Sequence, residues 1–361
     1  MKIRTLSLGL SAILLAGLAA RPAAAVEVLG KKLEIYAKAN ISLDASDNDR
    51  SGGNLQNDLS LSSNSSRVGF KGVLPAGSGM EAVYQVEQEV GFDSGSGNFA
   101  TRNTFVGLQG GFGRIIFGHH DTPFKTAAAK WGLFGDTVGD RRKILGASAL
   151  HGNKLNNRAK NAVMYTNGIG DLRFDLMYSP DGKDSAKGAI DNNNKAMYSF
   201  DAVYQTGPVK LAAAYVKWDD LSSTFGSVKG WRAYARYHFG RFMVGGIYED
   251  VNVDSATKDP SLDRSAWGLN GSVALPGDLS LRAEYLRADD YAGVANSGAN
   301  AYTLGLFGKF NKTVHWYAAY TTTRNDANAQ YQGVDGGHGD EVKTDLGRNP
   351  TSFSLGLVVK L

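Results

Sequence analysis

Apolar and polar residues alternate with a period of two along much of this chain. The alternation is clearest over residues 33–44, where every second position is apolar: Leu33, Ile35, Ala37, Ala39, Ile41 and Leu43. The positions between them are almost all polar, from Glu34 to Asp44. Because successive side chains of a β-strand point to opposite faces, this pattern predicts a strand with one apolar and one polar side.

The same pattern recurs, and it predicts sixteen strands in all. Their predicted starts lie near residues 32, 57, 79, 99, 112, 158, 170, 195, 208, 227, 241, 263, 278, 298, 312 and 350. Short turns of Gly, Pro and Asn connect the strands in pairs, as at Gly110-Gly111 and Pro276-Gly277. Longer polar links, such as 180–194 and 324–349, separate the pairs. Short turns on one rim and long loops on the other are typical of a transmembrane β-barrel.

The number of strands indicates how they are arranged. An open sheet of sixteen amphipathic strands would leave two unpaired edges and a wide apolar face in water. Closing the sheet removes the edges, and a bilayer solvates the apolar face. A charge on the lipid face costs about 2–4 kcal/mol at mid-membrane, which explains why the apolar faces of the clear strands carry no charged residue. The fold class predicted here is therefore an all-β, antiparallel, 16-stranded transmembrane barrel, wide enough for an aqueous channel.

The start of the chain predicts export. Two basic residues, an apolar run and the small-residue motif Ala23-x-Ala25 follow one another, as in a secretory signal peptide. We therefore expect residues 1–25 to be removed and residues 26–361 to form one barrel domain. The chain contains no cysteine, which excludes disulfides and cysteine-ligated metal sites.

Net charge gives no support for a nucleic-acid partner. The chain has 39 Lys and Arg against 35 Asp and Glu. Removal of the predicted peptide takes away Lys2, Arg4 and Arg21, which leaves 36 basic residues against the same 35 acidic ones. A balance so close to zero lacks the basic excess of nucleic-acid-binding proteins.

Six stretches of sequence, taken in order, resemble a known family. They are LEIYAKA from Leu33, SRVGFKG from Ser66, TRNTFVGL from Thr101, GFGRIIFG from Gly111, DTPFK from Asp121 and RAKNAVMY from Arg158. Together they resemble the trimeric general porins of Gram-negative outer membranes, especially the β-proteobacterial branch. The resemblance implies a homotrimer in contact with outer-membrane lipid and lipopolysaccharide. It also implies a third loop that folds into the lumen and narrows it, here the long link from about 120 to 157.

The resemblance further implies a pore constriction in which basic wall residues face acidic loop residues. The wall positions that match are Lys38, Arg67, Arg102 and Arg158, and strand alternation places Lys71 on the same side as Arg67. The loop positions that match are Asp136 and Asp140. Because the loop also carries several bases between Lys130 and Lys143, we hypothesise a mild preference for anions. The alternative is that the wall bases pair with lumen carboxylates such as Glu34 or Glu81 and confer no selectivity.

These features predict an outer-membrane channel for passive diffusion of ions and small hydrophilic solutes, with no enzymatic activity and no cofactor. Two alternatives remain: a channel specific for an anion such as phosphate or a sugar acid, and a non-conducting structural or adhesive barrel. No metal site is expected, since adjacent His119 and His120 would point to opposite faces of a strand. The acidic stretch 335–341 lacks a calcium-loop spacing and is interpreted as a solvated surface loop.

Overall fold

The computed structural model describes residues 26–50, 58–95, 99–146, 155–182, 196–219, 226–254 and 262–361. The predicted signal peptide, residues 1–25, lies outside the described residues. Among those residues, no helix has both the length and the apolar character needed to cross a bilayer.

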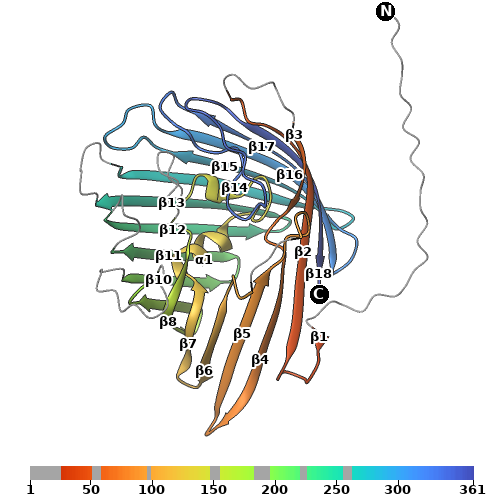
Figure 1. The fold of residues 1–361 in the computed structure, drawn as a ribbon, viewed down its shortest axis with the longest axis vertical. Coiled ribbons are helices and arrows are strands. Elements are labelled where there is room, and N and C mark those ends of the chain that lie inside the picture. Colours follow the sequence, from red (N-terminus) through yellow and green to blue (C-terminus); the bar gives the residue numbers. More distant parts are fainter. Residues whose placement is uncertain are drawn as a thin grey trace, which may run out of the picture.

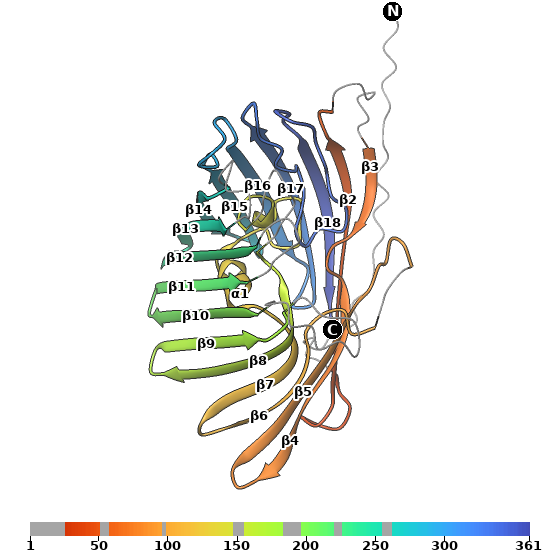
Figure 2. The ribbon, with the colours of Figure 1, turned by 60° about the vertical axis from the view of Figure 1, so that its left-hand side comes forward.

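In the described part of the chain, the strands form one antiparallel sheet that closes into a barrel (Figures 1 and 2). The ring closes where β18 (Thr351–Lys360) pairs with β2 (Glu34–Asp47). Both β3 (Asp58–Ser63) and β4 (Arg67–Gly77) pair with β2, so they act as one barrel strand interrupted at residues 64–66. The two-residue β1 (Val26–Glu27) pairs with the beginning of β2. Counted in this way, the described residues build the sixteen predicted barrel strands.

The remaining strands follow the predicted order. They are β5 (Met80–Glu89), β6 (Thr104–Gly110), β7 (Gly113–Asp121), β8 (Arg158–Ile169), β9 (Leu172–Ser179), β10 (Met197–Thr206), β11 (Val209–Trp218), β12 (Ser227–Phe239), β13 (Phe242–Asp254), β14 (Arg264–Leu275), β15 (Leu279–Ala288), β16 (Ala299–Lys309) and β17 (Val314–Asn325). Each strand starts within two residues of its prediction except β6, which starts five residues late. Before β6, the backbone N–H of Arg102 turns back to donate to the carbonyl oxygen of Glu87 at 3.1 Å, which delays the strand.

The apolar face of the barrel strands is exposed and the polar face is buried, which is the reverse of a water-soluble protein. In β2, the polar Asn40 and Asp44 are 2% and 1% exposed, whereas Leu43 between them is 45% exposed. In β18, Ser354 is buried and its neighbour Leu355 is 51% exposed. A row of exposed large apolar residues on the outside requires an apolar solvent, and the bilayer supplies it.

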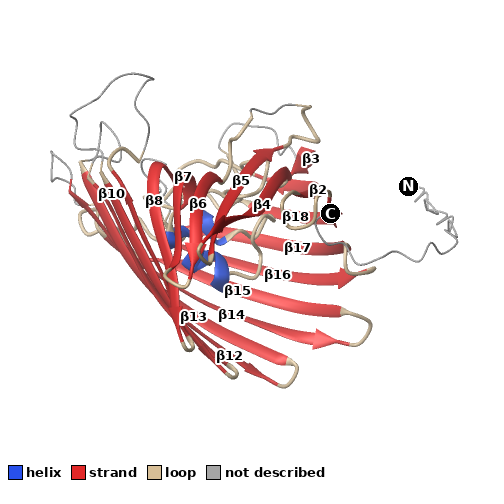
Figure 3. Ribbon diagram, turned by 90° about the horizontal axis from the view of Figure 1, so that it is seen from below, coloured by secondary structure: helices blue, strands red, loops and turns tan. Residues whose placement is uncertain are grey.

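One helix of the described residues, α1 (Pro123–Trp131), follows β7 and contacts strands β9 to β13 (Figure 3). Thr122 caps it by accepting a hydrogen bond from the backbone N–H of Lys125, and Pro123 occupies its first turn, where no N–H is required. A short 3-10 helix, Arg141–Lys143, lies further along the same link. This link connects β7 to β8 and carries the charged groups described next.

Candidate functional site

The link of residues 122–157, here called loop 3 and described except for 147–154, is anchored on the inner wall by a buried arginine. Arg232 of β12 is fully buried and donates from Nη2 to Glu249 Oε2 at 2.5 Å. Its Nη1 donates to the carbonyl oxygen of Phe124 at 3.2 Å, and its guanidinium lies 3.5 Å from the centroid of the Phe124 ring. Glu249 also accepts from the backbone N–H of Gly146 at 2.6 Å. One buried ion pair therefore holds both the outgoing and the returning limb of loop 3.

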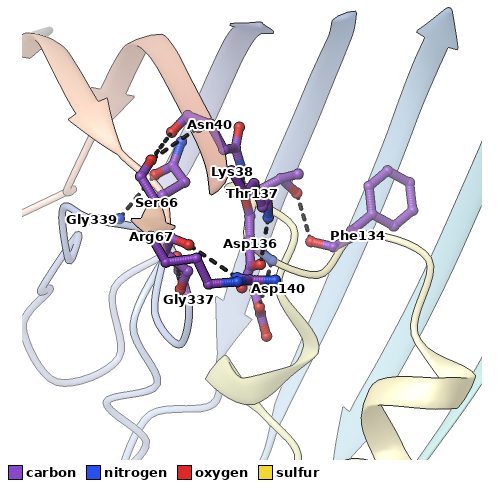
Figure 4. Close-up of polar contacts among 12 residues, drawn as sticks. Lys38, Asn40, Ser66, Arg67, Phe134, Asp136, Thr137, Asp140, Gly337 and Gly339 are labelled. Carbon is purple, nitrogen blue, oxygen red and sulfur yellow. Dashed lines mark hydrogen bonds and ion pairs between the residues drawn. The ribbon is translucent and has the colours of Figure 1, made fainter. Parts of the chain in front are cut away.

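Further along, loop 3 crosses to the opposite side of the barrel. Asn270 of β14 donates to the carbonyl oxygen of Trp131 at 3.0 Å, and Glu284 of β15 accepts from the N–H of Leu133 at 3.2 Å. The tip then meets β2, where Lys38 Nζ lies 2.8 Å from Asp136 Oδ2 (Figure 4). The loop thus runs along the strands from β10 to β17 and ends at β2.

The tip of loop 3 carries a compact charge cluster. Arg142 Nη2 lies 2.6 Å from Asp140 Oδ2 and 3.1 Å from Asp136 Oδ1. Burial raises the pKa of Asp136, but the positive charges of Lys38 and Arg142 outweigh it and hold that pKa below its ordinary value. Arg142 likewise outweighs the burial of Asp140 and lowers its pKa. Both carboxylates are therefore ionised at neutral pH, and Asp140 is engaged within the loop rather than exposed toward the wall.

The wall beside the tip of loop 3 has its own ion pairs around Glu87 of β5. Arg102 Nε lies 2.6 Å from Glu87 Oε1, and Arg67 Nε lies 3.4 Å from Oε2. Tyr36 donates its hydroxyl to the same carboxylate at 2.9 Å. Arg102 Nη1 also reaches Glu89 at 3.2 Å. One inward glutamate thus ties together three strands and two of the predicted wall arginines.

A second pairing centre lies where β7 enters loop 3. Asp121 Oδ1 forms ion pairs with Arg158 Nε at 3.1 Å and with Lys125 Nζ at 2.6 Å. Asn103 Nδ2 donates to the other carboxylate oxygen, Asp121 Oδ2, at 3.2 Å. Burial lowers the pKa of Lys125 to about 8, although the neighbouring Asp121 opposes the shift. This centre fixes Arg158 beside the start of the loop.

The structure brings together most, but not all, of the residues predicted from sequence. Lys71 lies closer to the short-turn rim, where it pairs with Glu34 at 3.1 Å, as the alternative interpretation proposed for a wall base. The other four wall bases line the same side of the lumen as the loop tip. Arg142, one of the loop bases noted in the sequence, completes this charged ring together with three groups that sequence reasoning missed: Glu87, Asp121 and Lys125. Strand alternation places Glu87 inward, but no local pattern identifies its partners.

A second long link, residues 326–350, here called loop 8, also reaches the lumen. The interpretation of 335–341 as a solvated loop is wrong for Asp335 and His338, which are 3% and 6% exposed. His338 Nε2 lies 3.0 Å from Asp44 Oδ2, and Ser65 donates to the carbonyl oxygen of Gly337 at 2.9 Å. A Cβ at Gly337 would collide with Asp136 and Arg142 of loop 3, so the missing side chain permits this approach (Figure 4).

In the part of the chain that the structure describes, no three His, Asp or Glu side chains converge in a way that could hold a metal ion. The site therefore consists of paired charges, hydroxyls and amides around a lumen.

A closed barrel with an apolar outer face and a charged interior defines the class: a β-barrel of the Gram-negative outer membrane. The chain belongs to the Gram-negative porin family, whose model matches residues 10–328. Members of this family are typically channels rather than enzymes.

Individual relatives agree with this assignment. The chain is 34% identical over 111 residues to the major outer membrane protein P.IB of Neisseria meningitidis, a match covering 30% of this chain and 33% of that protein. It is 29% identical over 181 residues to an outer membrane porin of Bordetella pertussis, covering 46% and 45%. The matches thus span a third to a half of these relatives.

Solved structures show the same fold at low identity. An anion-selective porin from Comamonas acidovorans superposes with a TM-score of 0.75 at 19% identity, covering 91% of this chain and 99% of that one. OmpF of Salmonella typhi superposes with a TM-score of 0.65 at 15% identity, covering 94% and 100%.

Proposed function

We propose that this protein forms a water-filled channel for passive diffusion of ions and small hydrophilic solutes, narrowed at loop 3. One observation carries the proposal: loop 3 spans the inner wall and its tip meets Lys38, while three arginines on the wall beside Lys38 stay partly exposed. The side chains of Arg67, Arg102 and Arg158 are 26%, 11% and 18% exposed. Charges that remain hydrated inside a barrel are what a path for hydrophilic solutes requires.

The arrangement of these charges supplies the mechanism. Paired cations and carboxylates on facing sides of the narrowing create a field across the pore. A hydrophilic solute keeps its dipole aligned and solvated in that field, whereas an apolar solute gains nothing from it. Transport of this kind requires no bond to form or break, so it needs neither a catalytic group nor a cofactor.

The balance of charge favours anions. Six bases surround the proposed constriction: Lys38, Arg67, Arg102, Lys125, Arg142 and Arg158. The carboxylates paired with them are Glu87, Glu89, Asp121, Asp136 and Asp140, of which Asp140 is fully buried. The excess of six bases over five carboxylates supports a mild anion preference. The Comamonas porin of similar fold is itself described as anion-selective.

Assembly follows the family. We infer a homotrimer, as one solved OmpT of Vibrio cholerae with this fold is described in a trimer form. The exposed apolar belt would then contact neighbouring subunits, outer-membrane lipid and lipopolysaccharide.

A non-conducting barrel is the second candidate, because the tip of loop 8 occupies lumen space beside loop 3. Single-channel recording of the refolded protein in a planar bilayer distinguishes the two. We expect stepwise current increases, grouped in threes, in 1 M KCl. A folded barrel that inserts without conducting would overturn the channel proposal and support the closed one.

A further inference from the structure

Three inward-facing cations lie on the short-turn side of loop 3, away from the constriction. They are Lys210 of β11, Arg236 of β12 and Arg282 of β15. Lys210 and Arg236 are direct cross-strand partners. Lys210 shares its strand face with the buried Ala212, while Leu211 between them is 44% exposed, so the lysine points into the barrel. We call these three residues the cationic arc.

The two arginines of the arc are held by the backbone of loop 3. Arg236 Nη1 donates to the carbonyl oxygen of Lys130 at 2.6 Å. Arg282 Nη1 donates to the carbonyl oxygen of Leu133 at 3.0 Å, and its guanidinium lies 3.8 Å from the centroid of the Phe307 ring. One edge of each guanidinium is thus fixed, which orients the group without neutralising its charge.

Between the two arginines, β13 carries a glycine on its inner face. Gly245 of β13 faces inward beside Arg236, and a Cβ there would lie 3.1 Å from Arg236 Cγ and 2.8 Å from Asn270 Oδ1. The arginine side chain therefore crosses the glycine toward β14, in the direction of Arg282. Arg236 Nε is buried and has no hydrogen-bond partner. A donor is left unfilled at the centre of the arc.

No carboxylate neutralises the arc. Among the described residues, none of its three members has an ion-pair partner. Glu284 lies two residues from Arg282 on the same face of β15 but forms no ion pair with it, and its carboxylate accepts a hydrogen bond from the N–H of Leu133. The neighbouring cations, by contrast, are paired: Lys130 with Asp201 at 3.3 Å and Arg173 with Asp175 at 3.0 Å.

Like charges confined in a mouth with low-dielectric walls raise the local concentration of counter-ions. Strands β12 and β15 are three strand spacings apart, or about 14 Å at the backbone. The two arginine side chains approach each other within the lumen, because they donate to the carbonyl oxygens of Lys130 and Leu133, which are three residues apart in loop 3. A small anion with one charge meets one of these cations, whereas an anion with several oxyanion groups meets more than one, and each guanidinium edge matches an oxyanion.

We propose that Lys210, Arg236 and Arg282 form a binding subsite for small anions that carry two or more oxyanion groups, of the class of tricarboxylates and pyrophosphate. The subsite lies on the strands opposite the proposed constriction wall. This inference rests on the proposed channel function, because anions reach the subsite through the lumen. It specifies the class of solute that the channel would favour.

Calorimetric titration of citrate into the folded, detergent-solubilised protein tests the subsite without requiring an open pore. We expect citrate to bind the wild type, and acetate not to bind. The double variant Arg236→Gln/Arg282→Gln should bind citrate at least about tenfold more weakly, since it loses two charge-assisted partners. Arg241→Gln removes a positive charge from the adjacent turn, outside the arc, and should bind like the wild type.

Equal citrate affinity in wild type and double variant, or no binding to the wild type, would overturn the subsite. Lys210→Gln provides a second variant, expected to bind several-fold more weakly, should the double variant not fold. Conductance in KCl is measured in parallel. A wild type that conducts normally but does not bind citrate contradicts the subsite alone, whereas a wild type that binds citrate without conducting contradicts the channel alone.

Discussion

The two sides of the lumen differ in whether their basic side chains are paired with carboxylates. On the side of β2 to β8, each base of the proposed constriction has a carboxylate within 3.4 Å, as Arg102 has Glu87. On the side of β11 to β15, Lys210, Arg236 and Arg282 have none among the described residues. Pairing lowers the cost of confined charge and fixes side-chain positions, so the first side suits a rigid narrowing. Unpaired cations retain their attraction for anions, so the second side suits binding.

The largest expected effect comes from breaking the Arg232–Glu249 ion pair, which anchors loop 3 on the inner wall. Arg232→Met leaves the buried Glu249 with only the more distant Arg264, at 3.6 Å, and should destabilise the protein by about 3 kcal/mol. Loop 3 should also loosen, which raises single-channel conductance. Urea unfolding of the folded barrel measures the first effect, and bilayer recording the second.

The control for this anchor is the double variant Arg232→Met/Glu249→Gln, which removes both charges. It should recover part of the lost stability, because the carboxylate is gone and the buried Arg264 keeps its hydrogen bond to the carbonyl oxygen of Ile144. Equal destabilisation in the single and double variants would contradict the ion-pair account.

A pH effect should appear at Lys143, where loop 3 meets loop 8. Its ammonium donates to Thr321 and to the carbonyl oxygen of Gly333. Burial lowers its pKa from 10.5 to about 7, although Glu284 and Asp140 oppose the shift. Between these values the unfolded chain binds a proton that the folded protein does not. Stability should therefore rise with pH from 7 to 10, by up to about 1.4 kcal/mol per unit.

Lys143→Met tests this linkage, because it removes the titrating group and should flatten that rise. Urea midpoints at pH 7.5 and 9.5 provide the comparison. A wild type whose stability falls over this interval would contradict the assignment.

The contact between the two loops can be broken at one glycine. Gly337→Ala places a methyl group against Asp136 and Arg142 and should cost about 1–3 kcal/mol by overpacking. The tip of loop 8 should move away from loop 3, which increases conductance. Gly111→Ala is the matched control, since a Cβ at Gly111 meets no atom within 4 Å. Identical behaviour of the two variants would show that the loops are not in contact.

The smallest expected effect is on ion selectivity, and it comes from removing one paired base of the proposed constriction. Arg67→Gln removes a partly exposed base whose partner, Glu87, keeps Arg102. We expect the anion-to-cation permeability ratio to fall about two- to fivefold, equivalent to about 0.4–1 kcal/mol, because the charge is paired and screened. Lys71→Gln, on the same strand but outside the ring, should shift the ratio less. A larger shift for Lys71→Gln would place the narrowing nearer the short-turn rim.

The fold was predictable because its signal is local. The alternation of apolar and polar residues in β2 or β18 is visible within ten residues, and the turn residues mark where each strand ends. The delayed start of β6 was not visible, because it depends on a bond from Arg102 to Glu87 across the hairpin.

The site was less predictable because its contacts are long-range. The Lys38–Asp136 pair joins residues 98 positions apart and was suggested by family resemblance, not by spacing. The burial of His338 against Asp44 spans 294 positions, and a Gly-rich acidic stretch looks the same whether it faces solvent or enters a lumen. The cationic arc is likewise made by strands whose order in the barrel, not in the sequence, brings the charges together.

The most direct test of the charge comparison is the zero-current potential of the wild-type channel across a tenfold KCl gradient. Paired charges at the constriction and an unneutralised arc beneath it predict a potential with the sign of anion preference, shrinking as ionic strength rises and screening increases. A potential with the sign of cation preference would contradict this account, since it would mean that the loop carboxylates, not the wall bases and the arc, govern the pore.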